Sequence, residues 1–520
     1  MGALPSKTIK AMYFDNGCEL SPWIRSVSGV AGGTMSVSDQ WIITLHPERV
    51  TYQERFLNRV FVKIIPNIIH PNEDTNLRIQ DLLSEVKIYG DVIKPIIDKK
   101  ICPFFLPVIN VTYNCSASSL IEMLRDKSPD ENFRLKVPPE KSEPFDPETV
   151  FVRNMALTLH SLILEEETVA VCIQPDIEIK NRNQQYPKEE HVDSISFLKQ
   201  FTTGAPVAVL TDSNNNNCIQ KYRNSILEHP YTLLYTQPIE GNETVYRYIL
   251  QLGEDHDTHG MFFLCFQMSI AFATMHSSKL LHSDLHLNNI LMKTLDQHEK
   301  VMYIVEDVLF TYVNRKIPIV FDFDRSNAKR HFNNKFEEIR LRSDLWGFFL
   351  DLYVLFVNPE WKDAVISCVF KPRYQEQARQ YWDSLYTKYG PDENYVYIGR
   401  RKTDVERMNM YTDDPVQIII NWAKASGVVK IAPVVEVPLD ELMDNRARRY
   451  IYRSSFFDSD TGVIIEEDPF SCLYGYAQTI YLPENTQEII DRKHILARQN
   501  LKLLQLKLQL QRQQELKKPV

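Results

Sequence analysis

The stretch Leu280–Met292 sets four polar side chains into otherwise apolar sequence: His282, Asp284, His286 and Asn289. A segment bounded by apolar runs is expected to be buried, and buried polar groups need partners. A carboxylate and an amide held on such a frame could address one reaction centre. Asp284 could accept a proton from a hydroxyl group while Asn289 holds a metal ion.

A lysine on a short apolar segment could bring positive charge to the same centre. The segment Arg59–Pro66 reads R-V-F-V-K-I-I-P, and its length and β-branched content predict a strand. With a period of two residues, Lys63 shares a face with Phe61 and Ile65. Because a lysine in such surroundings is seldom fully buried alone, we predict an acidic partner. The alternative is an edge-strand lysine that reaches solvent.

The next element, Leu77–Ile97, has helical periodicity. Glu85 borders the apolar stripe of this helix, and under the family resemblance described below it is the best-placed partner for Lys63. The competing carboxylates nearby are Glu73, Asp81 and Asp91. A solvated helix carboxylate is the alternative interpretation.

Further carboxylates follow a second apolar segment. Lys316–Phe321 is strand-like and leads directly into Asp322, Phe323 and Asp324. Carboxylates at the end of an apolar strand suit Mg²⁺, a hard ion that prefers oxygen ligands. An ordinary loop aspartate is the alternative.

Glycines near the start of the chain could cradle phosphates. Ser26–Thr34 reads S-V-S-G-V-A-G-G-T and contains Gly29, Gly32 and Gly33. Glycine lets backbone approach a ligand closely, and free N–H groups in such a loop can bind anions. A hairpin turn without a ligand explains the same composition.

The opening stretch resembles the catalytic loop of the protein-kinase-like superfamily, whose signature is H-R-D-L-x-x-x-N. The matching positions are His282, Asp284, Leu285 and Asn289, and Ser283 replaces the arginine. The other segments resemble kinase parts in the family's order, from the glycine loop and the lysine strand to the D-F-G motif. In the segment that resembles D-F-G, Asp322 and Phe323 match and Asp324 replaces the glycine.

The resemblance implies a phosphotransferase with ATP and Mg²⁺ as cofactors. Lys63, held by Glu85, would bind the nucleotide phosphates together with the glycines Gly29, Gly32 and Gly33. Asn289 and Asp322 would ligate Mg²⁺.

The resemblance also assigns the loop residues. Asp284 would be the catalytic base for the acceptor hydroxyl, and His282 would support the loop. Asp344, in Ser343–Gly347, is similar to an aspartate that holds the catalytic loop from beneath in the family.

The fold implied is α+β: a two-lobed protein-kinase-like fold with a small β-rich N-lobe, a mainly helical C-lobe and large insertions. We expect an N-terminal extension at 1–25 and an N-lobe at 26–240 with an insertion around 114–200. A C-lobe at 241–485 and a C-terminal amphipathic helix at 486–520 would follow. Further expected elements are strands at Cys102–Val111, Thr232–Gln237 and Val301–Phe310, a buried helix at Gly260–His276, and a helix from Ser343 that ends before Pro359.

The acceptor stays open between three hypotheses. The foremost is a divergent serine/threonine protein kinase acting on a protein substrate, similar in style to the kinases of large DNA viruses such as iridoviruses. A small-molecule kinase of the aminoglycoside-phosphotransferase type is favoured by His286 and by the few residues between Asp322 and Asp344. A pseudokinase scaffold is the third, but it does not need all four of Lys63, Asp284, Asn289 and Asp322.

Composition excludes several other classes. The net charge is −9 and no long basic run is present, so no nucleic-acid partner is expected. The eight cysteines are scattered without a C-x-x-C pair, which indicates reduced thiols in a cytoplasmic setting, either host cytoplasm or virion if the protein is viral. Met261–Met275 is too short for a membrane span and contains Gln267 and Ser269, so we expect no transmembrane segment.

The two ends carry optional signals. The N-terminal sequence fits the N-myristoylation pattern at Gly2, and one acyl chain would give weak membrane association. Glu488–Lys518 is rich in Leu, Gln, Lys and Arg and predicts an amphipathic helix for partner binding or self-association, or else a solvated terminal helix.

Overall fold

The protein is an α+β protein with mainly antiparallel sheets, which confirms the predicted class at that level. Gly2, the helix expected at Glu488–Lys518 and most of the 114–200 insertion lie outside the residues that the structure describes. The computed structural model describes residues 7–8, 24–29, 38–46, 50–52, 55–69, 73–126, 146–160, 208–209, 218–238, 243–324, 326–328, 343–355, 358–389, 414–438, 442 and 446–465.

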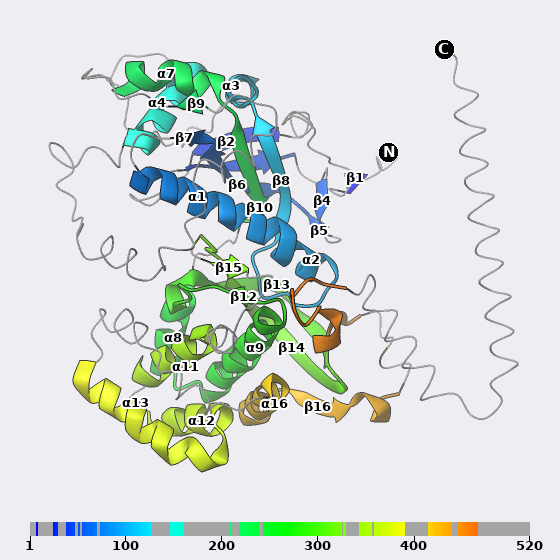
Figure 1. The fold of residues 1–520 in the computed structure, drawn as a ribbon. Coiled ribbons are helices and arrows are strands. Elements are labelled where there is room, and N and C mark those ends of the chain that lie inside the picture. The colour runs from blue at the N-terminus through cyan, green and yellow to red at the C-terminus, as the bar shows by residue number, and fades with distance from the viewer. Residues whose placement is uncertain are drawn as a thin grey trace, which may run out of the picture.

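The upper part of Figure 1 is built on a five-stranded antiparallel sheet with the order β2-β3-β6-β10-β8. Its strands are β2 (Ile24–Gly29), β3 (Asp39–Leu45), β6 (Arg59–Pro66), β10 (Tyr231–Thr236) and β8 (Val108–Cys115). The predicted bounds of β6 are confirmed. Because β6 pairs with β3 on one side and β10 on the other, Lys63 lies on a central strand rather than at an edge.

One helical run packs against this sheet and comprises α1 (Glu73–Ile88), a π-helical turn (Tyr89–Ile93) and α2 (Lys94–Asp98). Leu77–Ile97 was expected to be one regular helix, and the π-helical turn corrects that expectation. Pro95 explains the difference, because it has no N–H to donate and its ring would clash with the carbonyl four residues earlier. The backbone widens instead, and the N–H of Lys94 bonds to the carbonyl of Tyr89.

The strand expected at Cys102–Val111 begins later than predicted, at Val108. Pro103 and Pro107 lack the N–H groups that a strand ladder requires, so this connection stays irregular. It pairs instead with the lower part of the molecule: Val320 donates its N–H to the carbonyl of Phe104 and accepts that of Leu106.

Three helices gather at the far end of the first sheet in Figure 1: α3 (Ala117–Asp126), α4 (Pro147–His160) and α7 (Cys218–Glu228). Two of them fall within the expected insertion. Phe151 of α4 packs edge-on against Trp41 and Tyr231 of the sheet, with ring centroids 6.3 and 5.4 Å apart. Aromatic burial therefore joins the described part of this region to the sheet.

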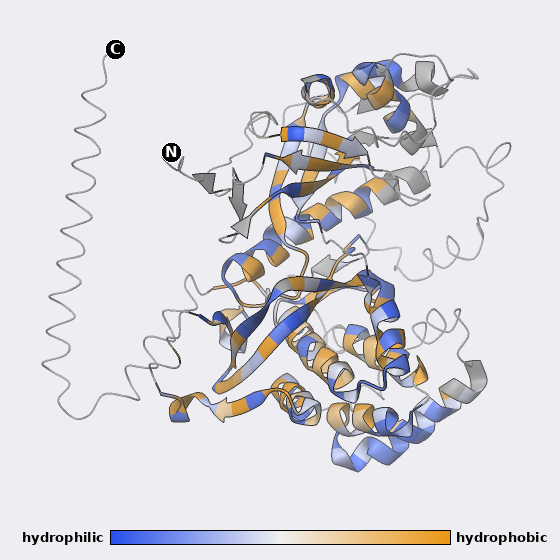
Figure 2. Ribbon diagram, turned by 180° about the vertical axis from the view of Figure 1, so that it is seen from behind, coloured by the Kyte–Doolittle hydropathy of each residue, from blue (hydrophilic) through white to orange (hydrophobic). Residues whose placement is uncertain are grey.

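Helices form most of the lower part, around the long helix α9 (Thr258–Ser277). The expected helix Gly260–His276 is confirmed within two residues at its start and one at its end. By length and apolarity α9 could cross a membrane, but 78% of its apolar window is buried inside the protein, as in a core helix. The surrounding helices are α8 (Val245–Glu254), α11 (Ser343–Leu355), α12 (Pro359–Val369), α13 (Gln375–Tyr389) and α16 (Pro415–Ser426). Figure 2 shows the contrast between the hydrophobic α9 and the mostly hydrophilic α13 at the periphery.

A second sheet accompanies these helices and was only partly anticipated. The long hairpin of β13 (Ile290–Val305) and β14 (Val308–Val320) pairs with three short strands, namely β11 (Glu243–Thr244), β16 (Lys430–Pro433) and β17 (Arg448–Tyr452). The expected strand Val301–Phe310 is divided between the end of β13 and the start of β14, because the chain reverses at Glu306, which has a φ of 50°. The turn lacks the usual Asn-Gly or Asp-Gly signal, so the reversal was not visible in the sequence.

Candidate active site

Lys63 and Glu85 form a buried ion pair between β6 and α1. The distance from Nζ of Lys63 to Oε2 of Glu85 is 2.6 Å, and the two side chains are 12% and 4% exposed. The structure thus pairs Lys63 with the carboxylate expected from the sequence rather than with a competitor on the same helix. Both charges are compensated at a position where either alone would be costly.

The charges around this pair are unbalanced. Burial lowers the pKa of Lys63, but attraction from Glu85, Asp322 and Asp324 outweighs it and the net pKa is raised. Burial raises the pKa of Glu85 to about 7, with Lys63 opposing the shift and the two aspartates adding to it. Both shifts favour the protonated form, chiefly through burial for Glu85 and through attraction to the carboxylates for Lys63. Three carboxylates act on one ammonium group, which leaves an excess of negative charge. The same excess of negative charge favours a divalent cation.

Asp344 holds the loop that contains Asp284 from below. One carboxylate oxygen accepts the N–H of His282 at 2.6 Å, and the other accepts the N–H of Ser283 at 3.1 Å. Ser283 has a φ of 66°, a conformation that such bonds help to maintain. Asp344 is buried in the first turn of α11, so the support that the resemblance implied is present as geometry.

His282 links this loop to the end of β14. Its side chain is fully buried, and Nε2 donates to the carbonyl of Phe321 at 2.9 Å. Its Nδ1 has no hydrogen-bond partner in the described part of the chain. The imidazole ring lies 4.7 Å from the ring of Phe323. His282 therefore contacts both Phe321 and Phe323 directly.

Asn289 fixes the other end of the loop. Its Nδ2 donates to the carbonyl of Asp284 at 2.9 Å, which leaves Oδ1 as the oxygen for a metal ion. Its backbone carbonyl accepts the N–H of Phe321 at 3.2 Å. Asn289 is 6% exposed, whereas Asp284 is half-buried. These two hydrogen bonds hold the loop beside Phe321, and Asp322 is the next residue in the chain.

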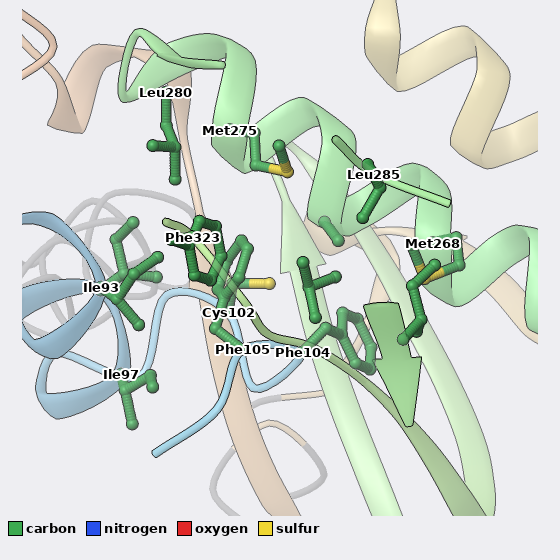
Figure 3. Close-up of a cluster of buried hydrophobic side chains, with 14 of the residues drawn as sticks. Ile93, Ile97, Cys102, Phe104, Phe105, Met268, Met275, Leu280, Leu285 and Phe323 are labelled. Atoms are coloured by element: carbon green, nitrogen blue, oxygen red, sulfur yellow. The ribbon is translucent and has the colours of Figure 1, made fainter. Parts of the chain in front are cut away.

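Asp322 and Phe323 occupy the junction between the two parts of the molecule. Asp322 has a φ of 66°, and its charge acts on both Lys63 and Glu85. Phe323 is fully buried, and its ring lies 5.3 Å from that of Tyr89 in an edge-on contact and 6.3 Å from that of Phe105. Figure 3 shows Phe323 within a cluster of buried apolar side chains that come from the helical run, the irregular connection and α9.

The oxygen ligands present fit Mg²⁺ in the manner of a nucleotide site. Among the described residues no three His, Cys, Asp or Glu side chains group as a metal site. Mg²⁺ commonly takes one or two protein carboxylates together with substrate phosphates and water. Asp322 and Oδ1 of Asn289 match that smaller requirement.

Part of the expected phosphate cradle can be placed. Gly29 is the last residue of β2 and pairs with Trp41 of β3, so the glycine segment begins where this hairpin turns. Gly32 and Gly33 lie outside the described residues.

Two residues of the site were missed at the level of sequence. The Oγ of Ser326 donates to the carbonyl of His282 at 3.0 Å. Tyr89 reaches Phe323 from the helix. The signal for Tyr89 was present, because it follows Glu85 by four residues and therefore shares its helix face.

A scan against protein-family models and a search of curated proteins give no match for this chain.

Proposed function

We propose that this protein is an ATP- and Mg²⁺-dependent phosphotransferase with a two-lobed protein-kinase-like fold, and foremost a divergent serine/threonine protein kinase. The observation that carries the proposal is the buried Lys63–Glu85 pair at 2.6 Å, with Asp322 close enough to shift both groups. In protein kinases such a pair joins the third strand to the following helix, and it must form together with the metal-binding aspartate. Here Lys63 lies on the third strand of the main sheet in chain order.

The mechanism follows from positioning and charge. Lys63 would bind the α- and β-phosphates of ATP, and Glu85 keeps its ammonium group in place. Asp322 and Asn289 would hold Mg²⁺, which neutralises charge on the phosphates when it is bound. Asp284 would orient the acceptor hydroxyl and take its proton as the γ-phosphoryl group is transferred.

The supporting groups account for the precision that this chemistry needs. Asp344 fixes the backbone of His282 and Ser283, and Asn289 fixes the carbonyl of Asp284. The base and the metal ligand are therefore carried on one loop with little freedom. Such preorganisation supplies most of the acceleration in phosphoryl transfer.

A small-molecule kinase is the second candidate, and His286 favours it. Its Nδ1 accepts the N–H of Asn288 at 3.2 Å, so this side chain caps the short turn of the loop. It occupies the position at which protein-serine kinases usually carry a lysine. A side chain used for capping is less suited to contact a protein acceptor.

The deciding experiment is transfer of labelled γ-phosphate from Mg-ATP to the protein itself and to generic protein substrates, beside Asp284→Asn. Label on protein that vanishes in the variant supports the protein kinase. Mg²⁺-dependent ATP binding without labelled protein favours a small-molecule acceptor, to be found by screening. Absence of both binding and transfer contradicts the proposal and leaves a pseudokinase scaffold.

A further inference from the structure

The helical run that carries Glu85 ends in a motif that usually contains glycine. The N–H of Ile101 bonds to the carbonyl of Ile96 at 2.9 Å, and that of Lys100 bonds to the carbonyl of Ile97 at 3.0 Å. These two bonds form a Schellman motif, in which the residue after the cap is left-handed and most often glycine. Here that residue is Lys100, with a φ of 55°, so further contacts must stabilise this helix end.

Two donors from the second sheet bind the helix end. The hydroxyl of Tyr303, on β13, donates to the carbonyl of Ile101. The N–H of Ile451, on β17, donates to the carbonyl of Lys100 at 3.2 Å. Burial raises the pKa of Tyr303 well above its usual value, so the hydroxyl keeps the proton that it donates. Two consecutive carbonyls are therefore held by two strands of the lower part of the molecule.

Aromatic stacking strengthens the same attachment. The ring of Tyr303 is fully buried and stacks on Phe104, with centroids 6.4 Å apart and an angle of 11° between the planes. It also stacks on Tyr450 of β17, with centroids 5.6 Å apart and an angle of 25°. Figure 3 places Phe104 in one buried cluster with Ile97 of the helical run and Met268 of α9. Tyr303 therefore contacts both the connection after the helix and the strand β17.

The connection that follows the helix end also leads to the proposed metal site. The backbone bonds of Phe104 and Leu106 with Val320 hold this connection to β14, two residues before Asp322. The helical run with Glu85 and the end of β14 with Asp322 thus share one support. A shift of the helix end against the second sheet would move Glu85 relative to Asp322.

We propose that Tyr303 is a positioning residue that anchors the end of the Glu85 helix to the second sheet, with β17 as a second anchor, and thereby keeps the Lys63–Glu85 pair beside Asp322. This inference rests on the proposed function, because it takes Lys63 and Asp322 as ligands of the nucleotide and the metal ion. It gives β17, which follows Asp322 by more than a hundred residues, a part in the geometry of the site.

The matched variants are Tyr303→Phe and Tyr312→Phe. The first keeps the stacked ring and removes the hydroxyl that binds Ile101. The second removes another buried hydroxyl of the same hairpin, which has no hydrogen-bond partner in the described part of the chain. A further variant, Tyr450→Leu, removes a ring from the stack and leaves the hydroxyl of Tyr303 in place.

Amide hydrogen exchange measures the anchor directly. Exchange at Ile451 and Leu106 in the free protein should become roughly 2- to 10-fold faster in Tyr303→Phe, as expected for the loss of one hydrogen bond. Tyr450→Leu should change it in the same direction, and Tyr312→Phe should leave it at the wild-type rate.

Reactivity of the Lys63 amine measures the effect on the site without requiring activity. Acetylation by acetic anhydride, followed by mass spectrometry, should be slow at Lys63 in the wild type, because its ammonium group is buried and paired. It should become roughly 2- to 10-fold faster in Tyr303→Phe. Lys94 is the internal reference, because its pair with Asp98 lies within α2 and should not respond.

The outcomes separate this inference from the proposed function. Unchanged exchange in Tyr303→Phe, or faster exchange with wild-type reactivity of Lys63, overturns the positioning role. Equal changes in Tyr312→Phe overturn it as well. If Tyr303→Phe gives both expected changes but the wild-type protein neither binds Mg-ATP nor transfers phosphate, the anchor stands and only the phosphotransferase is contradicted.

Discussion

Two histidines of this protein have similar burial, hydrogen bonding and aromatic contacts, but their hydrogen-bond partners come from different parts of the chain. His282 and His229 are 0% and 1% exposed, and each bonds a backbone carbonyl through one ring nitrogen. In each, the other nitrogen lacks a hydrogen-bond partner within the described residues. Each ring also lies on an aromatic ring, Phe323 at 4.7 Å and Tyr231 at 4.9 Å.

The difference lies in where the partners come from. His229 bonds to the carbonyl of Ser225, four residues earlier, at the end of its own helix. His282 bonds to Phe321, 39 residues away, and its N–H is held by Asp344, 62 residues away. Burial with one satisfied nitrogen is therefore compatible with a purely local histidine. The convergence of distant segments is what distinguishes the region of His282.

The largest effect is expected at Asp322, in the convergent region. Asp322→Asn removes the charge that would hold the metal ion, so the rate of γ-phosphate transfer should fall roughly 10²- to 10³-fold, about 3–4 kcal/mol. Initial rates at saturating Mg-ATP measure this. Asp383→Asn is the control, because the Asp383 carboxylate accepts the hydroxyl hydrogen of Tyr353 at 2.7 Å on the outer helices, away from the site. Equal losses in both variants would contradict the assigned metal site.

The pH dependence of stability should have opposite slopes in the two regions. Burial lowers the pKa of His229 from 6.5 to about 4. The contribution of His229 to the unfolding free energy is therefore complete above pH 6.5 and is lost as the pH falls toward 4. The pKa of Glu85 is raised from 4.5 to about 7, chiefly by burial. The contribution of Glu85 to the unfolding free energy is therefore complete below pH 4.5 and is lost as the pH rises through 7. Each change should amount to a few kcal/mol at most.

Denaturant titrations between pH 4 and 8 measure these slopes against two non-titrating references. His229→Leu should remove the decline of stability on the acid side, and Glu85→Gln should remove the decline between pH 4.5 and 7. Saturation with Mg-ATP should also suppress the Glu85 slope, because added positive charge lowers the pKa of that carboxyl group. If both variants kept the wild-type pH dependence of stability, the shifted pKa values of His229 and Glu85 would not be its cause.

The same substitution at the two histidines should separate stability from activity. His282→Leu and His229→Leu each lose one buried hydrogen bond, which costs about 1–3 kcal/mol of unfolding free energy. Only His282→Leu should also lower kcat, roughly 10-fold or more, since it frees Phe321 and the residues that follow.

A conservative variant controls for mere loss of fold. His282→Gln can place an Nε2 donor near the carbonyl of Phe321 and should recover part of kcat. If His229→Leu lowered kcat as much as His282→Leu, the distinction between the two regions would fail.

The sequence was most informative where a single physical pattern dominates. The bounds of β6 and α9 followed from β-branched content and a long apolar run. The pair of Lys63 with Glu85 was expected from the resemblance to kinases, and strand and helix periodicity indicated the face on which each side chain lies. The hydrogen bonds of Asp344 to the loop were expected only through the resemblance to kinases.

The remaining features depend on tertiary context. The turn at Glu306 carries no turn signal, and the pairing of β13 with β17 joins residues far apart in the chain. The widened turn could have been suspected from Pro95, whose effect on the helix is local. The contact of Ser326 with His282 could not have been expected, since a serine two residues after the charged D-F-D motif has no distinguishing pattern.

The smallest effect is expected at Ser326. Ser326→Ala removes the hydrogen bond from its hydroxyl to the carbonyl of His282 at 3.0 Å, which joins two segments of the site. The expected loss is about 0.5–1.5 kcal/mol of unfolding free energy. Ser269→Ala removes an equally ordinary bond, from its hydroxyl to the carbonyl of Cys265 at 2.7 Å within α9. Both variants should lose similar stability in denaturant titration. Only Ser326→Ala should change the transfer rate, by roughly 2- to 5-fold, because the lost bond positions the loop of Asp284 rather than one helix. A rate change in Ser269→Ala of the same size would show that catalysis follows stability alone, and the contrast between convergent and local partners would then have no functional meaning.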